Sequence, residues 1–297
     1  MKIFNFGSLN LDKVYSVKDF VKSGETVAVT DFQTFPGGKG LNQSVAAARA
    51  GGEVYHVGCI GSDGLFLKEY LEENNVNCDF VKTVDGASGH AIIQLNQKGQ
   101  NCILVYAGAN FRLEKEQIDG AFEKMSEGDI VLLQNEINSV EYILTKGREK
   151  GARIVMNPSP VTDALFKYPF HTVNVFILNE TEAFALSGLS DAKEALDRLC
   201  SLYPEAEFVL TLGEKGCVYK YKDTEMKFGI FKTETVDTTG AGDTFCGYYL
   251  SCTAKGMNPK EACVYASAAA AIAVSIKGAG SSIPDMKTVE AFLQRER

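Results

Sequence analysis

A short glycine-rich stretch followed by a helical pattern carries the clearest chemistry in the sequence. Residues 236–247 read Val-Asp-Thr-Thr-Gly-Ala-Gly-Asp-Thr-Phe-Cys-Gly, and apolar side chains recur at helical spacing beyond Asp243. Gly240 and Gly242 permit backbone conformations that are closed to other residues. The first N–H groups of a helix have no partner inside it, so those of Ala241, Gly242 and Asp243 predict an anion site suited to phosphate.

Asp243 stands at the positive end of this predicted helix, where the helix dipole favours an ionised carboxylate. Such a carboxylate beside a phosphate site can accept a proton from an attacking hydroxyl, so the stretch indicates phosphoryl transfer with Asp243 as the general base. A simple helix cap is the alternative, because Asp is also a preferred capping residue. Taken alone, the short motif favours the cap.

A second glycine-rich loop also combines binding groups with the start of a helix. Residues 35–43 read Phe-Pro-Gly-Gly-Lys-Gly-Leu-Asn-Gln and lead into a small-residue helix predicted over 44–50. Glycines allow a ligand to approach the backbone closely, and a helix start offers N–H donors. A tight connection between strand and helix is the alternative, but the mixture of residue types favours a binding loop that includes Gly38, Lys39 and Asn42.

Short apolar strands alternate with helical patterns along most of the chain. The strands are predicted over residues 3–7, 54–59, 130–134, 153–157, 175–179 and 208–212, and helices over 65–74, 139–150 and 192–202. This alternation predicts an α/β fold, a doubly wound and mostly parallel sheet with helices on both faces. Ligands of such sheets bind at the carboxyl ends of the strands. Polar residues occur there, namely Asn10, Asp12, Asn135, Glu136, Asn157, Asn179, Glu182, Thr211 and Gly213.

Two of these groups have equally simple structural explanations. Asn10 and Asp12 can form an ordinary turn, because both residue types favour turns. Asn179 and Glu182 lie three apart at a predicted helix start, where they can order the water shell of a Mg²⁺ ion. The same spacing resembles a capping box, and taken alone the cap is the simpler interpretation.

Two further stretches indicate strands outside the α/β alternation. Residues 26–35 alternate loosely and are rich in Val, Thr and Phe, and residues 91–96 and 101–106 predict a hairpin around Gly99. Together they indicate a small sheet that covers a site or contacts a partner chain. A buried helix is predicted over residues 266–276, which are too few to cross a membrane.

Composition restricts the class of protein. The chain has 297 residues, 45% of them hydrophobic, and a formal net charge of −8, which argues against a nucleic-acid or anionic-membrane surface. The eight cysteines and three histidines are scattered, so we expect reduced thiols and no zinc or His-based metal site. The N-terminus reads as a buried strand rather than a signal peptide, so the cytoplasm is the expected location. The chain has neither a P-loop nor the protein-kinase motifs, so a kinase here must use another design.

Five motifs together resemble the PfkB family of carbohydrate kinases. In chain order they are Gly7-Ser-Leu-Asn-Leu-Asp12, Pro36-Gly-Gly-Lys-Gly-Leu-Asn42, Asn179-Glu-Thr-Glu182, Thr211-Leu-Gly213 and Asp237-Thr-Thr-Gly-Ala-Gly-Asp-Thr-Phe245. The resemblance extends nearly from end to end, and the two glycine motifs are specific as a pair. It implies a single ribokinase-like domain over residues 1–297, with a discontinuous β lid formed by roughly residues 12–35 and 88–107.

The resemblance also implies a role for each motif. Sugar hydroxyls would be held by Asn10, Asp12, Gly38, Lys39, Asn42 and Glu136. Asp243 would deprotonate the sugar hydroxyl that attacks the γ-phosphate of ATP, beside an anion hole formed by Gly240, Ala241 and Gly242. The nucleotide would lie along Asn179, Thr211, Gly213, Gly216 and Gly242, and Glu182 would act through Mg²⁺. A K⁺ ion would be held by Asp237, the carbonyl of Thr239 and further backbone between residues 275 and 281.

The implied reaction is the ATP-dependent phosphorylation of the primary hydroxyl of a sugar, with D-ribose favoured and D-ribose 5-phosphate as product. Deoxyribose, fructose or a nucleoside are alternative substrates, because related kinases differ mainly around the same pocket. A catalytically silent sugar-binding regulator and a dinucleotide-dependent oxidoreductase are alternatives of other classes. The intact Asp243 motif disfavours the first, and the lack of Gly-x-Gly-x-x-Gly after the first strand disfavours the second. The lid strands imply a homodimer.

Overall fold

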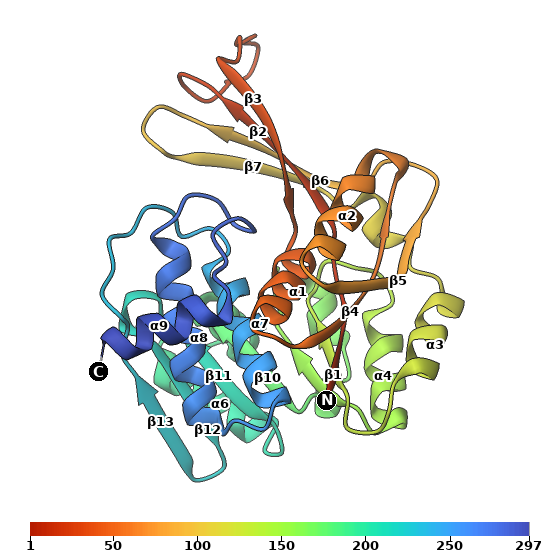
Figure 1. Cartoon of the computed structure of the whole chain (residues 1–297), viewed down its shortest axis with the longest axis vertical. Coiled ribbons are helices and arrows are strands. Elements are labelled where there is room, and N and C mark those ends of the chain that lie inside the picture. Colours follow the sequence, from red (N-terminus) through yellow and green to blue (C-terminus); the bar gives the residue numbers. More distant parts are fainter. Residues whose placement is uncertain (297) are drawn as a thin grey trace.

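A nine-stranded sheet forms the centre of the computed structural model, which describes residues 1–296 (Figure 1). Its strand order is β13-β12-β11-β10-β9-β8-β1-β4-β5. The pairs from β11 to β5 are parallel, whereas β12 and β13 are antiparallel. The strands are β1 (Lys2–Phe6), β4 (Glu53–Ile60), β5 (Val76–Thr83), β8 (Ile130–Leu133), β9 (Arg153–Met156), β10 (Val175–Asn179), β11 (Glu207–Thr211), β12 (Cys217–Tyr221) and β13 (Thr224–Phe228).

Helices cover both faces of this sheet because its central strands are apolar on both sides. In β8, Ile130 and Leu132 belong to one buried cluster and Val131 and Leu133 to the other. The first cluster includes side chains of α1 (Lys39–Arg49), α2 (Leu65–Glu73), α7 (Ala241–Ala254), α8 (Pro259–Val274) and α9 (Met286–Arg295). The second includes those of α3 (Lys115–Lys124), α4 (Val140–Lys150), α5 (Glu180–Ser187) and α6 (Ala192–Leu202). The predicted fold class is therefore confirmed.

A separate four-stranded sheet projects from this body and has the order β3-β2-β6-β7 (Figure 1). Its strands are β2 (Asn10–Ser16), β3 (Asp31–Gly37), β6 (Gly89–Leu95) and β7 (Asn101–Tyr106). The predicted hairpin around Gly99 is confirmed, and Gly99 has the positive φ of 75° that its turn requires. We refer to these four strands as the small sheet.

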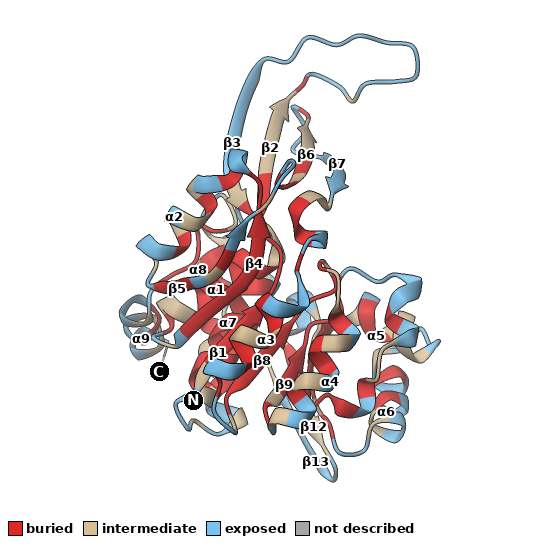
Figure 2. Cartoon of the chain, turned by 90° about the vertical axis from the view of Figure 1, so that its right-hand side faces the viewer, coloured by how far each residue is buried: buried red, intermediate tan, exposed pale blue. Residues whose placement is uncertain are grey.

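Two details of the small sheet differ from the sequence prediction. The strand predicted over residues 26–35 begins only at Asp31, and residues 17–30 form a long, mostly exposed loop (Figure 2). Asn10 and Asp12, for which a turn is the alternative interpretation, lie in β2, which pairs with both β3 and β6. Pairing on both edges satisfies the backbone of β2, and this tertiary effect overrides the turn preference of Asn10 and Asp12.

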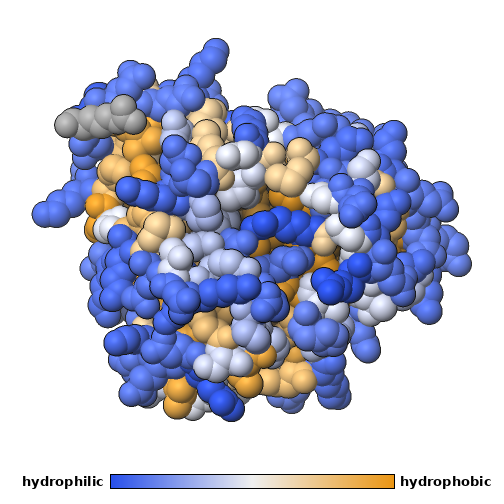
Figure 3. All heavy atoms as spheres, turned by 90° about the horizontal axis from the view of Figure 1, so that it is seen from below, coloured by the Kyte–Doolittle hydropathy of each residue, from blue (hydrophilic) through white to orange (hydrophobic). Residues whose placement is uncertain are grey.

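The surface opposite the small sheet is mainly hydrophilic, with only scattered hydrophobic side chains (Figure 3). The apolar run predicted as a buried helix lies in the C-terminal half of α8, which ends at Val274. Within residues 1–296, no helix is both long and apolar enough to cross a membrane. All eight cysteines are free, and most are buried.

Candidate active site

The glycine turn before α7 leaves backbone donors open, as the sequence predicts. Gly240 takes a left-handed conformation with φ of 75°, and the helix begins at Ala241. In residues 1–296 the N–H groups of Gly242 and Asp243 have no hydrogen-bond acceptor, whereas that of Ala241 donates to the Thr238 carbonyl at 3.3 Å. A Cβ added at Gly242 would meet no atom within 4 Å. The first turn of α7 therefore offers two free donors and open space for an anion.

Asp243 does not cap its own helix. Its carboxylate lies against α1, where Asn42 Nδ2 donates to Oδ2 at 3.2 Å and Gln43 Nε2 donates to Oδ1 at 2.9 Å. Lys39 Nζ lies 3.9 Å from Oδ1. The two helices pack side by side, so residues 200 positions apart in the chain meet at one place (Figure 1). Within residues 1–296 the side-chain hydrogen bonds of Asp243 go to Asn42 and Gln43 and to no N–H group of α7, so the capping alternative for Asp243 is wrong.

A further acidic side chain, that of Glu136, lies close to Lys39 at the start of α1. Ser8 Oγ donates a short hydrogen bond to Glu136 Oε2, and the N–H of Lys39 donates to the same oxygen at 3.3 Å. Burial raises the pKa of Glu136, although these donors oppose the rise. The pKa of Lys39 is raised chiefly by the charge of Asp243. Lys39 therefore stays cationic between two carboxyl groups and can bridge them to a polar ligand.

The surroundings of Asp12 change its pKa strongly. Burial, followed by the charges of Glu136 and Asp243, raises its pKa from 3.8 to about 7. Its side chain occupies the space over Gly37, where any Cβ would collide with the carboxyl group. Glycine at position 37 thus makes room for Asp12 on the neighbouring strand, which pairs with it in the small sheet.

We expect Asp12→Asn to change how stability depends on pH. A carboxyl group with a raised pKa holds its proton more tightly in the folded state, so wild-type stability falls as pH rises from about 4 to about 7. The variant lacks this loss, and its melting temperature should gain on that of the wild type between pH 5 and pH 8. Thermal unfolding at both pH values measures the gain, and an equal difference at the two pH values would contradict the raised pKa.

Asn10 is held in place by Asn110, a residue that no pattern in the sequence indicates. Asn110 Nδ2 donates to Asn10 Oδ1 at 2.7 Å, and Asn110 Oδ1 accepts from the N–H of Leu9 at 2.9 Å. Asn110 lies 100 positions away and is buried. Gly38, with φ of 93°, precedes α1 and lies close to Asn10. The loops after β1 and β3 thus meet at the base of the small sheet.

The residues predicted to bind a nucleotide follow neighbouring strands. Asn179 and Thr211 are paired at the ends of β10 and β11. Gly213 and Gly216 follow in the next turn, both with positive φ, and a Cβ at Gly216 would collide with the Phe228 carbonyl. These residues lie on the same rim as the loop before α1 that includes Gly38 and Lys39, because the carboxyl ends of parallel strands share one edge.

The capping box between Asn179 and Glu182 is formed at the start of α5. The Asn179 N–H donates to Glu182 Oε2 at 2.9 Å, and the Glu182 N–H donates to Asn179 Oδ1 at 3.0 Å. Burial raises the pKa of Glu182, opposed by the Asn179 hydrogen bond and the charge of Lys39. Both carboxylate oxygens have protein donors, so the group fits a Mg²⁺ ion through water rather than by direct ligation. Within residues 1–296, no three His, Cys, Asp or Glu side chains form a metal-binding group.

Asp237 connects the glycine turn with the segment that follows α8. Its Oδ1 accepts from the N–H of Thr239 at 2.9 Å, and its Oδ2 accepts from the N–H of Gly278 at 3.0 Å. Burial raises the pKa of Asp237, but these hydrogen bonds outweigh it, and the net shift is downward. An ionised carboxylate between two backbone turns fits the oxygen-rich surroundings that a K⁺ ion requires.

Other polar residues of the site were not predicted from the sequence. Gln43 contacts Asp243, and Ser8 contacts Glu136. Both stand beside motif residues, but no periodicity indicates which way their side chains point.

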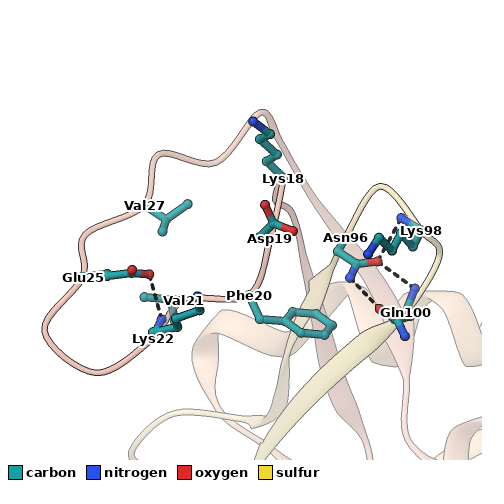
Figure 4. Close-up of a pocket in the computed structure, with 10 residues that line it drawn as sticks. All are labelled: Lys18, Asp19, Phe20, Val21, Lys22, Glu25, Val27, Asn96, Lys98 and Gln100. Atoms are coloured by element: carbon teal, nitrogen blue, oxygen red, sulfur yellow. Dashed lines mark hydrogen bonds between the residues drawn. The ribbon is translucent and has the colours of Figure 1, made fainter.

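An open pocket elsewhere lies at the tip of the small sheet, between the exposed loop and the β6–β7 turn (Figure 4). Its lining includes Lys18, Lys98 and Gln100 but none of the predicted site residues.

A parallel sheet with a carboxylate between an open helix N-terminus and a glycine-rich loop is the architecture of an α/β phosphotransferase. The family model for "pfkB family carbohydrate kinase" matches residues 2–286. The chain belongs to this family of carbohydrate kinases.

Solved structures and curated relatives are consistent with the family. The ribokinase of Bacillus subtilis is 36% identical over 97% of both chains, and a deoxyribokinase of Salmonella typhi is 30% identical over 99% of both. The crystal structure of Thermotoga maritima ribokinase has a TM-score of 0.89 and 35% identity over 99% of each chain. Arabidopsis thaliana ribokinase, complexed with ribose and ATP, has a TM-score of 0.88 and 28% identity over 99% of this chain and 98% of its own.

Proposed function

We propose that this protein transfers the γ-phosphate of ATP to the primary hydroxyl of D-ribose, yielding D-ribose 5-phosphate and ADP. The observation that carries the proposal is the position of Asp243, whose carboxylate faces the sugar loop while the N–H groups of its own helix turn stay open. The Arabidopsis relative at 28% identity binds both ribose and ATP. A base between an acceptor site and a phosphate site is the minimum that phosphoryl transfer requires.

The sugar loop supplies groups that can read hydroxyls. Within residues 1–296, the buried Oδ1 of Asn42 has no hydrogen-bond partner, while its Nδ2 donates to Asp243. A buried acceptor without a donor is costly, so a sugar hydroxyl that donates there would relieve that cost. Lys39 and the carboxyl groups of Glu136 and Asp12 surround the same space, and we assign them, with Asn10 and Gly38, to the remaining hydroxyls.

The proposed chemistry follows from these positions. Asp243 accepts the proton of the primary hydroxyl as its oxygen attacks the γ-phosphorus, and the bond to the β-phosphate oxygen breaks. The N–H groups of Gly242 and Asp243 stabilise the charge that develops on the transferred group. The bound nucleotide would lie along Asn179, Thr211, Gly213 and Gly216. Bound Mg²⁺, ordered through Glu182, would neutralise phosphate charge, and K⁺ held by Asp237 and Thr239 would support the anion hole.

We also propose that the small sheet acts as a lid and as the surface of a homodimer. It carries Asn10, Asp12 and Gly37 at its base, so its movement would open or cover the sugar site. Its exposed apolar side chains are Phe32, Phe35, Ile103, Leu104, Val105 and Tyr106. So many apolar groups on one small sheet favour contact with another chain. A single-chain mass in solution would contradict the dimer. Use of ATP makes the cytoplasm the proposed location.

A coupled ADP-release assay over a panel of sugars and nucleosides tests the function. We expect D-ribose to give the highest kcat/KM, and added K⁺ to increase it. Because a site that binds a hydroxyl can reject an analogue lacking it by up to ~10⁴, 2-deoxyribose separates the ribose proposal from the deoxyribose alternative. If deoxyribose, fructose or a nucleoside gives a higher kcat/KM than ribose, that compound takes the place of ribose as the proposed substrate. Sugar binding without ADP release would indicate a silent regulator instead.

A further inference from the structure

Gln43 lies at the centre of a buried chain of side-chain amides that ends on Asp243. Its Nε2 donates to Asp243 Oδ1 at 2.9 Å and to Asn157 Oδ1 at 3.1 Å, and its Oε1 accepts from Gln134 Nε2 at 2.7 Å. On the far side of this chain, Asn157 Nδ2 lies 3.5 Å from Glu182 Oε2. Two amide groups, those of Gln43 and Asn157, therefore connect the carboxylate on the sugar side with the carboxylate on the nucleotide side.

Backbone carbonyls at both ends determine which way each amide points. Asn157 Nδ2 donates to the Ile177 carbonyl at 3.0 Å, so its Oδ1 is the acceptor and Gln43 must present its NH₂ group. From the other end, Asn5 Nδ2 donates to a backbone carbonyl at 2.7 Å, so its Oδ1 accepts from Gln134 Nε2. Gln134 therefore donates to Gln43 Oε1, which again leaves the NH₂ group of Gln43 to donate to Asp243.

The side chain of Gln43 has no exposed surface, so it cannot contact a ligand itself. It can only act through the groups that it holds. Gln43 and Asn42 are adjacent in α1 and donate to different oxygens of Asp243. Two donors on two oxygens hold the plane of the carboxylate, whereas Asn42 alone would let it rotate.

We propose that Gln43 is a positioning residue that holds the Asp243 carboxylate in the orientation needed for proton transfer and, through Asn157, aligns it with Glu182. The proposal rests on the function proposed above, because it assumes that Asp243 is the base. Misplacement of a reacting group by about 1 Å can lower a rate by about 10²-fold. A rotated carboxylate would therefore affect turnover far more than sugar binding.

The test replaces Gln43 with methionine, which has a similar length and no N–H donors. We expect kcat for ribose to fall by about 10- to 100-fold with KM within about threefold of wild type. Gln43→Glu keeps the shape but replaces the NH₂ donor with a carboxylate, so its kcat should also fall while KM stays close to that of the wild type. It also provides the comparison if the methionine variant does not fold.

Gln117→Met is the matched control. Gln117 is buried; its Nε2 donates to the carbonyls of Gly58 and Phe80 at 2.8 Å each, and its Oε1 accepts from Cys59 Sγ at 3.4 Å, so the variant also loses internal hydrogen bonds. It should lower the melting temperature and leave kcat and KM unchanged. A Gln43→Met enzyme that behaves like this control, or whose crystal structure keeps the carboxylate in place, would overturn the proposal. A wild-type protein without kinase activity would instead refute the proposed function.

Discussion

Replacing Asp243 with asparagine should lower kcat for ribose by about 10²- to 10⁴-fold, the usual contribution of a positioned general base. The new amide cannot accept the hydroxyl proton at neutral pH, although it has nearly the same shape. We expect the affinity for ribose, measured by calorimetry, to stay within a few fold of wild type. Turnover close to wild type would remove Asp243 from its proposed role.

The site should tolerate this substitution structurally, for a reason visible in its hydrogen bonds. The new amide oxygen can accept from Gln43, and the new NH₂ group then faces Asn42. Because Asn42 Oδ1 has no hydrogen-bond partner within residues 1–296, a flip of the Asn42 amide turns that oxygen toward the new donor, and the NH₂ group then faces the sugar site, where a hydroxyl can accept instead of donate. The melting temperature should consequently change little, and lost turnover can be assigned to chemistry.

Asp191→Asn is the control for a purely structural role at a helix start. Asp191 caps α6 by accepting from the N–H groups of Lys193 and Glu194, and none of its contacts involves the site. Asparagine caps a helix about as well as aspartate. We therefore expect this variant to keep both the stability and the turnover of the wild type, in contrast to Asp243→Asn.

Replacing Gly247 with alanine should damage both stability and turnover. Gly247 lies one turn after Asp243 on the face of α7 that meets α1. An added Cβ would stand 2.5 Å from the Ala46 Cβ and 2.6 Å from the Ala47 nitrogen. Backbone atoms cannot move aside as a flexible side chain can, so the two helices must separate. Overpacking of this kind costs about 1–3 kcal/mol.

The same separation would move Asn42 and Gln43 away from Asp243, so we expect kcat to fall by up to about 10²-fold. Thermal unfolding and the ADP-release assay measure the two effects. Gly120→Ala in α3 is the matched control, since its Cβ would meet only a Phe80 ring atom at 3.8 Å. That change should raise stability by about 0.5–1 kcal/mol, because alanine favours a helix over glycine. If Gly247→Ala and Gly120→Ala had the same melting temperature and the same kcat, the close packing of α1 and α7 would be contradicted.

Local patterns in the sequence determined the fold class and most of the candidate site. Continuous apolar runs such as residues 130–133 indicate strands that are buried on both faces, and the turn before α7 depends on Gly240, which the sequence shows directly. The motifs around Gly38 and Asp243 were recognised for the same reason: a backbone that must bend or admit a ligand requires glycine at fixed positions. The roles of these residues stay predictions until they are tested.

Tertiary structure decided what no local pattern contains. Residues 10–16 form a strand only because two other segments pair with them, and the capping alternative for Asp243 fails only because α1 lies against α7. The side chains that hold the site from behind, Gln43 and Asn110, reach partners 100 to 200 positions away. The direction of an amide depends on which donors and acceptors surround it after folding, and that information belongs to the packed molecule.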